Sequence, residues 1–212
     1  MRKAKRLVAG VLAGVSLLSA CSFVQTSAQE NSPSYVTLNE FDNSLYLNYF
    51  MMMNALGKVS LNTDTAYVKN GEGSAKVWVQ PDPFDGYLGY RTPYLAHATE
   101  LKLQGLDYRD YSSVTAVEVD VFNPQDTVEE IGLWHVWSTR HRTHTGTETV
   151  WTELAPNSWT TVTLPVDLSL MELPDFCEGK YIKGVAISFK RPSADSEGKT
   201  FYLDGLRLKI HE

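Results

Sequence analysis

Residues 200–210 read Thr-Phe-Tyr-Leu-Asp-Gly-Leu-Arg-Leu-Lys-Ile, and this stretch decides the fold. Apolar residues occupy every second position up to Leu203 and again from Leu206 onward, so the alternation slips by one residue at Asp204-Gly205. A period of two is typical of a strand with one buried face, and a slip in it usually marks a β-bulge, which glycine accommodates. The stretch therefore predicts a last strand with a bulge at Asp204-Gly205, where the carboxylate of Asp204 departs from the alternation of the two faces. The alternative is a solvated Asp-Gly turn between two short strands.

Similar alternation recurs along the rest of the chain. The clearest example is residues 113–122 (SVTAVEVDVF), where Val117, Val119 and Val121 predict the buried face. Further strands are expected at residues 35–43, 74–80, 131–138, 147–154, 159–166 and 184–190, separated by turns that contain Gly, Pro or Asn. The sequence shows no convincing amphipathic helix. Short, regularly spaced strands of this kind predict an all-β fold, a two-sheet antiparallel β-sandwich.

The first 20 residues have the pattern of a signal peptide. A basic segment that contains Arg2, Lys3, Lys5 and Arg6 precedes an apolar run at residues 7–18, which is short for a membrane-spanning helix. The sequence Leu-Ser-Ala-Cys that ends at Cys21 resembles the lipobox of bacterial lipoproteins. That resemblance implies cleavage before Cys21 and acylation of this cysteine. We therefore expect a lipoprotein in the cell envelope, anchored to a membrane and facing outside the cytoplasm.

Composition limits the remaining possibilities. Residues 21–34 are small and polar and predict an acylated cysteine followed by a flexible tether, which leaves residues 35–212 as a single domain. Loss of the leader removes four of the 19 Lys and Arg and none of the 25 Asp and Glu, so the net charge falls from −6 to −10. This balance argues against nucleic acid as a partner. Cys177 would be the only cysteine besides the acylated one, so no internal disulfide is expected.

Four segments together resemble a known superfamily. Residues 41–42 (FD), 67–77 (YVKNGEGSAKV), 157–164 (NSWTTVTL) and 201–208 (FYLDGLRL) are similar to strands and turns of galactose-binding-like jelly-roll domains, which include many carbohydrate-binding modules. The resemblance spans most of residues 36–210. It implies a jelly-roll sandwich, and it implies a carbohydrate as the ligand.

The resemblance also implies a structural calcium ion. In that superfamily the opening strand, the Gly-rich turn and the acidic residue of the last strand commonly surround such an ion. Carried over, Asp42 and Asp204 would supply carboxylate oxygens, with Glu40 as an alternative, and backbone carbonyls near Lys69 and Gly71 would complete the set. Calcium accepts six to eight oxygen ligands of both kinds. It would also offset the cost of burying the carboxylate of Asp204.

Candidate sugar contacts are side chains that can stack on a sugar ring or bond to its hydroxyl groups. Trp78 faces outward by its strand phase, and the long connection at residues 81–98 carries further aromatic residues. Core packing is the competing interpretation for every large aromatic residue, and Trp134 and Trp137 cannot share one strand face. The expected ligand-binding residues are Trp78, Tyr87, Tyr90 and Arg91, with Glu118, Trp134 and Trp137 as further candidates.

Catalysis remains open. Glu118 and Asp120 lie two residues apart on one strand face, where a carboxylate pair could cleave a glycosidic bond, but such pairs are also common on solvated strands. Zinc could be bound by three histidines with suitable spacing, His135, His141 and His144. The alternative is that these histidines lie in a solvated loop.

Three functions follow from these patterns. The first is a surface-anchored lipoprotein that binds glycan without cleaving it, beside a separate enzyme or transporter component. The second is a glycan hydrolase or lyase of the same fold. The third is a protein-binding or structural domain of the envelope.

Overall fold

The computed structural model describes residues 33–47, 51–53, 57–82, 94–97, 113–138, 145–146, 148–166 and 181–211. The chain divides into two units, Met1–Asn31 and Ser32–Glu212, and every described element belongs to the second. The predicted signal peptide and the predicted acylation site at Cys21 lie outside the described residues. Within them, no helix has the length and apolar character needed to cross a bilayer.

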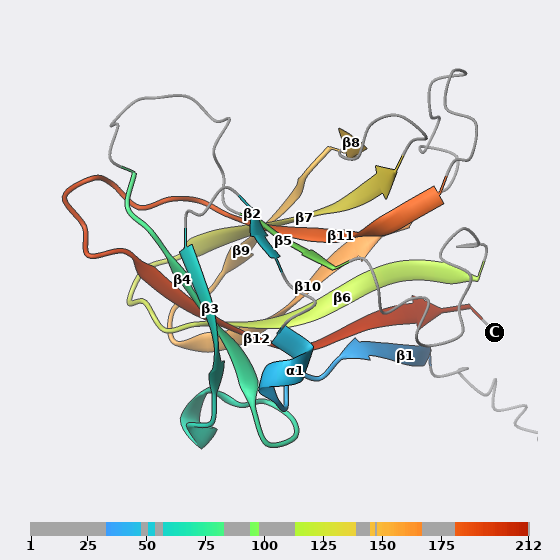
Figure 1. Ribbon diagram of the computed structural model, residues 1–212, viewed down its shortest axis with the longest axis horizontal. Helices are drawn as coiled ribbons and strands as arrows, with labels where there is room; N and C mark the ends of the chain where they lie inside the picture. Colours follow the sequence, from blue (N-terminus) through green and yellow to red (C-terminus); the bar gives the residue numbers. More distant parts are fainter. Residues whose placement is uncertain are drawn as a thin grey trace, which may run out of the picture. The chain divides into compact units, whose positions relative to one another are not determined.

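The described strands form two antiparallel sheets, which Figure 1 shows as two layers. The first, sheet A, has the order β10 (Ser158–Pro165), β6 (Val114–Asn123), β12 (Lys199–Ile210), β4 (Ser74–Val79), β3 (Gly57–Asn62), and β1 (Ser34–Asn39) also pairs with β12. The second, sheet B, has the order β2 (Met51–Met53), β5 (Tyr94–His97), β11 (Tyr181–Phe189), β7 (Glu129–Ser138), β8 (Thr145–Gly146), and β9 (Val150–Leu154) also pairs with β7. Two short helical segments, α1 (Ser44–Leu47) and η1 (Thr65–Tyr67), complete the described elements. The predicted two-sheet antiparallel sandwich is confirmed.

Alternate residues of the strands form the core between the sheets. Val117, Val119 and Val121 of β6 are fully buried, as the alternation predicted. From sheet B, Leu133 and Ile187 are equally inaccessible. The period of two therefore places one row of each strand in a shared apolar layer, which is the main source of stability in such a fold.

The bulge predicted in the last strand is present. The register between β12 and β6 shifts between Asp204 and Arg207, and Gly205 has φ +55°. Leu203 and Leu206 are both 0% exposed, so the extra residue restores the apolar face to the core after the slip. Asp204 is itself 0% exposed, so the alternative of a solvated Asp-Gly turn is wrong.

The bulge also marks a change of neighbour along β12. On the side away from β6, β12 pairs with β4 over Lys199–Leu203 and with β1 over Leu206–Ile210. The first and last strands of the domain are thus adjacent, and the end of β1 meets the start of β4 beside Asp204. This junction brings three distant parts of the sequence together.

Candidate functional site

Asp204 holds the turn that precedes β4. Its Oδ2 accepts hydrogen bonds from the backbone N–H of Lys69 at 2.8 Å and of Asn70 at 2.9 Å, whereas its buried Oδ1 has no partner. Burial raises the pKa of Asp204, which the backbone N–H groups of Asn70 and Lys69 only partly oppose. The carboxylate that the sequence placed in an apolar strand is therefore stabilised through one of its two oxygens.

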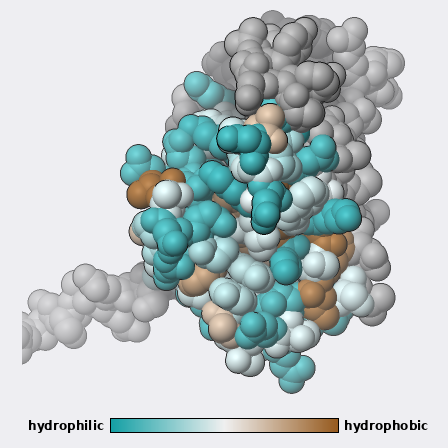
Figure 2. Space-filling view, turned by 90° about the vertical axis from the view of Figure 1, so that its left-hand side faces the viewer, coloured by the Kyte–Doolittle hydropathy of each residue, from teal (hydrophilic) through white to brown (hydrophobic). Residues whose placement is uncertain are grey.

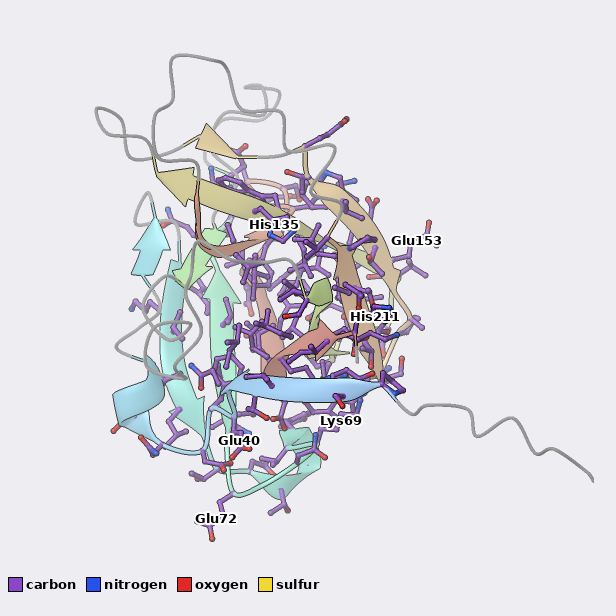
Figure 3. The ribbon with its side chains drawn as sticks, turned by 90° about the vertical axis from the view of Figure 1, so that its right-hand side faces the viewer. Glu40, Lys69, Glu72, His135, Glu153 and His211 are labelled. Atoms are coloured by element: carbon purple, nitrogen blue, oxygen red, sulfur yellow. The ribbon has the colours of Figure 1, made fainter. Side chains whose placement is uncertain are left out.

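Asp42 holds the same turn from the β1 side. Its Oδ1 accepts the backbone N–H of Glu72 at 2.8 Å and of Gly73 at 3.1 Å. Gly71 has φ +71°, and a Cβ there would lie 2.3 Å from Asp42 Oδ1, so no other residue fits without a shift. Figure 3 shows Glu40, Lys69 and Glu72 at this end of the molecule, with Glu72 pointing away from it.

The residues predicted for calcium are thus brought to one turn. Asp42 and Asp204 flank it, and Lys69 and Gly71 belong to it, whereas the side chain of Glu40 is exposed. The turn directs N–H groups at both carboxylates, and the described residues contain no cluster of three side chains suited to a metal. Calcium requires oxygen ligands, and Asp204 Oδ1 is the carboxylate oxygen here that is buried without a partner. The calcium site stays a prediction.

Glu118 and Asp120 form a buried ion network on the outer face of sheet A. Arg207 bonds to Glu118 Oε2 at 3.0 Å and to Asp120 Oδ2 at 2.7 Å, and Lys69 Nζ lies 2.7 Å from Asp120 Oδ1. Glu118 and Asp120 are only 6% and 1% exposed, so the interpretation of this pair as lying on a solvated strand is wrong. Their partners come from the turn before β4 and from β12, so the network links three segments of the domain.

The network also affects whether Asp120 and Glu118 could act in catalysis. Burial raises the pKa of Asp120, but hydrogen bonds from Arg207, Lys69 and Thr161 outweigh burial and hold the pKa below its usual value. A general acid needs a raised pKa. Asp120 is therefore poorly suited to protonate a leaving group, and Glu118 is occupied by Arg207 rather than open to a sugar.

Aromatic side chains cover the middle of the same face. Tyr67 of η1 stacks on Tyr202 of β12 with ring centroids 4.3 Å apart and planes within 4°. Phe122 contacts both the Tyr67 ring and the ring of Trp159, each at 5.4 Å. Trp159 is therefore a packing residue.

An open groove lies beside these aromatic side chains, at the β3–β4 side of sheet A. It has a volume of about 320 Å³ and is lined by Lys58, Ser60, Lys76, Trp78 and Thr200. We call it the Trp78 groove. Trp78 points outward because its neighbours Val77 and Val79 are fully buried. In the strand register Trp78 stands between Lys58 of β3 and Thr200 of β12, so three adjacent strands form the floor.

The indole of Trp78 is held from two sides. Lys58 Nζ lies 6.0 Å from the centre of the ring, within the range of a cation–π contact. At Gly198, which has φ +93°, a Cβ would come within 2.7 Å of Trp78 Nε1, so glycine permits this close approach of the backbone. The ring is thereby fixed while it remains partly exposed, as a stacking platform requires.

Sheet B carries a second exposed tryptophan. Trp151 of β9 is 39% exposed, lies over Gly132 and receives Lys190 Nζ at 5.3 Å from its ring centre. Trp134 is partly buried, and its Nε1 donates to Ser188 Oγ at 2.9 Å. Our sequence reasoning missed Trp151, although the inward phase of Leu154 in the same strand would have placed it outward.

The other predicted contacts fall elsewhere. Tyr87, Tyr90 and Arg91 lie outside the described residues, as does the side chain of Trp137. Figure 2 shows one side of the molecule, on which hydrophilic residues predominate and hydrophobic ones form only small patches.

Comparison with known proteins agrees with this architecture. No family model matches the chain, and no curated protein matches it. In structure it is similar to a family 11 carbohydrate-binding module from Clostridium thermocellum, solved with a β-1,3-1,4-mixed-linked tetrasaccharide, at 13% identity and a TM-score of 0.53 over 83% of this chain and 95% of that one. The chain has the jelly-roll fold of carbohydrate-binding modules.

Two further structures extend the comparison. The C-terminal family 22 carbohydrate-binding module of Clostridium thermocellum Xyn10B matches at 12% identity and a TM-score of 0.51, over 83% of this chain and 92% of that one. An exo-β-agarase matches at 14% identity and a TM-score of 0.53, over 83% of this chain but 25% of the enzyme. Identities this low establish the fold, so the ligand has to be argued from the residues.

Proposed function

We propose that this chain is a carbohydrate-binding domain and that the Trp78 groove receives the sugar. One observation carries the proposal: a partly exposed indole, fixed by Gly198 and Lys58, forms the floor of an open groove on a jelly-roll sheet. The structural neighbours support the ligand class, since one was solved with a tetrasaccharide and another is a carbohydrate-binding module.

The chemistry of the groove suits a sugar ring. The C–H face of a sugar is apolar and packs on an aromatic face, while its hydroxyl groups need hydrogen-bond partners at the rim. Ser60 and Thr200 offer hydroxyl groups there, and no described residue is hydrogen-bonded to either side chain. A groove of about 320 Å³ is at the lower end of the range for ligand sites, so we expect it to hold one or two sugar units.

A glycan array followed by calorimetry tests the proposal. We expect the full chain to bind at least one class of glycan and Trp78→Ala to weaken binding by about tenfold or more, which corresponds to about 1.4 kcal/mol. The matched control is Trp151→Ala, which removes the exposed tryptophan of the other sheet and should leave the affinity unchanged. Absence of binding to every glycan, or equal affinity of wild type and Trp78→Ala, would contradict the proposal.

We further propose that the domain binds without cleaving and that an acyl chain on Cys21 holds it at the cell envelope. The occupied state of Glu118 and Asp120 supports the first part, because neither carboxylate is available to a sugar. Release of reducing ends from a bound glycan would refute it. Fatty-acid labelling of the wild type that is lost in Cys21→Ser tests the anchor.

A further inference from the structure

We propose that the Trp78 groove is selective for sugars that carry an anionic group, a carboxylate or a sulfate. The inference rests on the proposed function and names the class of ligand. It comes from the charge of the lining residues: two of the five are lysines and none is acidic.

The two lysines have no carboxylate partner among the described residues. Lys58 and Lys76 are both exposed. By contrast, Lys190 and Lys199 are engaged with Glu130 and Glu129. Acidic partners are plentiful in a chain with a net charge of −6, yet neither ammonium group is bonded to a carboxylate of the described residues, so both can bind an anionic ligand while Lys58 keeps its contact with the Trp78 ring.

The lysines are also placed to reach a stacked sugar. Lys58 stands directly opposite Trp78 on the neighbouring strand, and Lys76 precedes Trp78 by two residues on the same strand face. Directly opposed Cβ atoms lie about 5 Å apart, and residues two apart on a strand lie about 7 Å apart. A ring stacked on the indole would therefore have an ammonium group near each of two adjacent edges. An anionic substituent at either edge would form a charge-assisted hydrogen bond.

The hydroxyl groups of Ser60 and Thr200 complete the rim. Ser60 stands opposite Lys76, and Thr200 stands opposite Trp78 on the side away from Lys58. The groove thus combines a flat apolar floor, neutral hydroxyl groups and two cations. A nucleic acid also offers rings and anions, but the excess of negative charge over the whole chain disfavours a polyanion of that charge density.

The test compares matched ligands by calorimetry with the full chain. An acidic oligosaccharide, oligogalacturonate, is measured beside its methyl ester, which keeps the rings and removes the charges. We expect the acid to bind about tenfold more tightly at low ionic strength, the gain that two exposed charge pairs supply together, and the preference to shrink in about 0.5 M salt. A sulfated galactan oligosaccharide shows which anion is preferred, and single-stranded DNA is measured as a competing class.

Variants distinguish a failure of the anionic selectivity from a failure of glycan binding. The double variant Lys58→Gln, Lys76→Gln should bind acid and ester with equal affinity, and loss of the Lys58 contact with the indole should weaken both to the same extent. Trp78→Ala should lose both, whereas Lys190→Gln, at a lysine that directly follows β11, should keep the wild-type preference. Equal affinity of the wild type for acid and ester, a preference that survives the double variant, or tighter binding of DNA would overturn the anionic selectivity and leave glycan binding intact. No binding of any glycan would instead overturn the proposed function.

Discussion

Acidification should destabilise the domain through His135. This side chain is 1% exposed, and Figure 3 shows it on β7 within the body of the domain. Burial lowers its pKa from 6.5 to about 4, against the opposing influence of the nearby backbone of Pro165. Between these two values the unfolded chain binds a proton that the folded chain does not, so the free energy of unfolding falls as the pH falls.

The size of the effect follows from the two pKa values. With 6.5 in the unfolded state and about 4 in the folded state, the contribution of His135 to stability decreases by about 2 kcal/mol between pH 7 and pH 5. Asp204 contributes in the opposite sense, because its raised pKa lets the folded state take up a proton first as the pH falls. The wild-type curve alone therefore mixes both groups, and a variant is needed to isolate the histidine.

Urea denaturation of His135→Leu at a series of pH values is the assay. The loss of stability from pH 7 to pH 5 should be about 2 kcal/mol smaller in this variant than in the wild type, whatever its stability at pH 7. His211→Leu is the control, because it removes a histidine that is exposed near the C-terminus instead of one in the core. Parallel pH curves for the wild type and His135→Leu would refute the reasoning.

Two further predictions concern the turn before β4. We propose that calcium raises the melting temperature of the wild type by several degrees and that Asp204→Ala abolishes the rise, because its Oδ1 is buried without a partner; identical melting curves with calcium and with a chelator would count against the ion. Gly71→Ala should destabilise the domain by about 1–3 kcal/mol, since the backbone has positive φ and the new Cβ would collide with Asp42 Oδ1. Urea denaturation measures this loss, and an unchanged midpoint would show that the turn relaxes freely.

Local sequence pattern was sufficient for most of the fold. Alternation identified the buried rows of β6 and β12, and the slip at Asp204-Gly205 located the bulge. Both are properties of one strand and its two faces. The outward position of Trp78 followed from the same rule, because its neighbours on either side are apolar.

Long-range pairing explains what the sequence did not reveal. Glu118 and Asp120 resemble solvated carboxylates within their own strand, and only the pairing of β6 with β12 brings Arg207 against both. The calcium ligands were expected to include backbone carbonyl groups of this turn. The turn instead points the N–H groups of Lys69 and Asn70 at Asp204. Residue types alone do not determine whether a turn directs its N–H or its C=O groups at a side chain.

The most direct test of the account is an NMR titration of the tryptophan indole N–H signals with a glycan that binds on the array. The signal that disappears in Trp78→Phe identifies the residue in the groove. We predict that this signal shifts saturably as the glycan is added while that of Trp151 stays in place. A saturable shift of Trp151 with Trp78 unmoved would contradict the assignment of the site to the Trp78 groove.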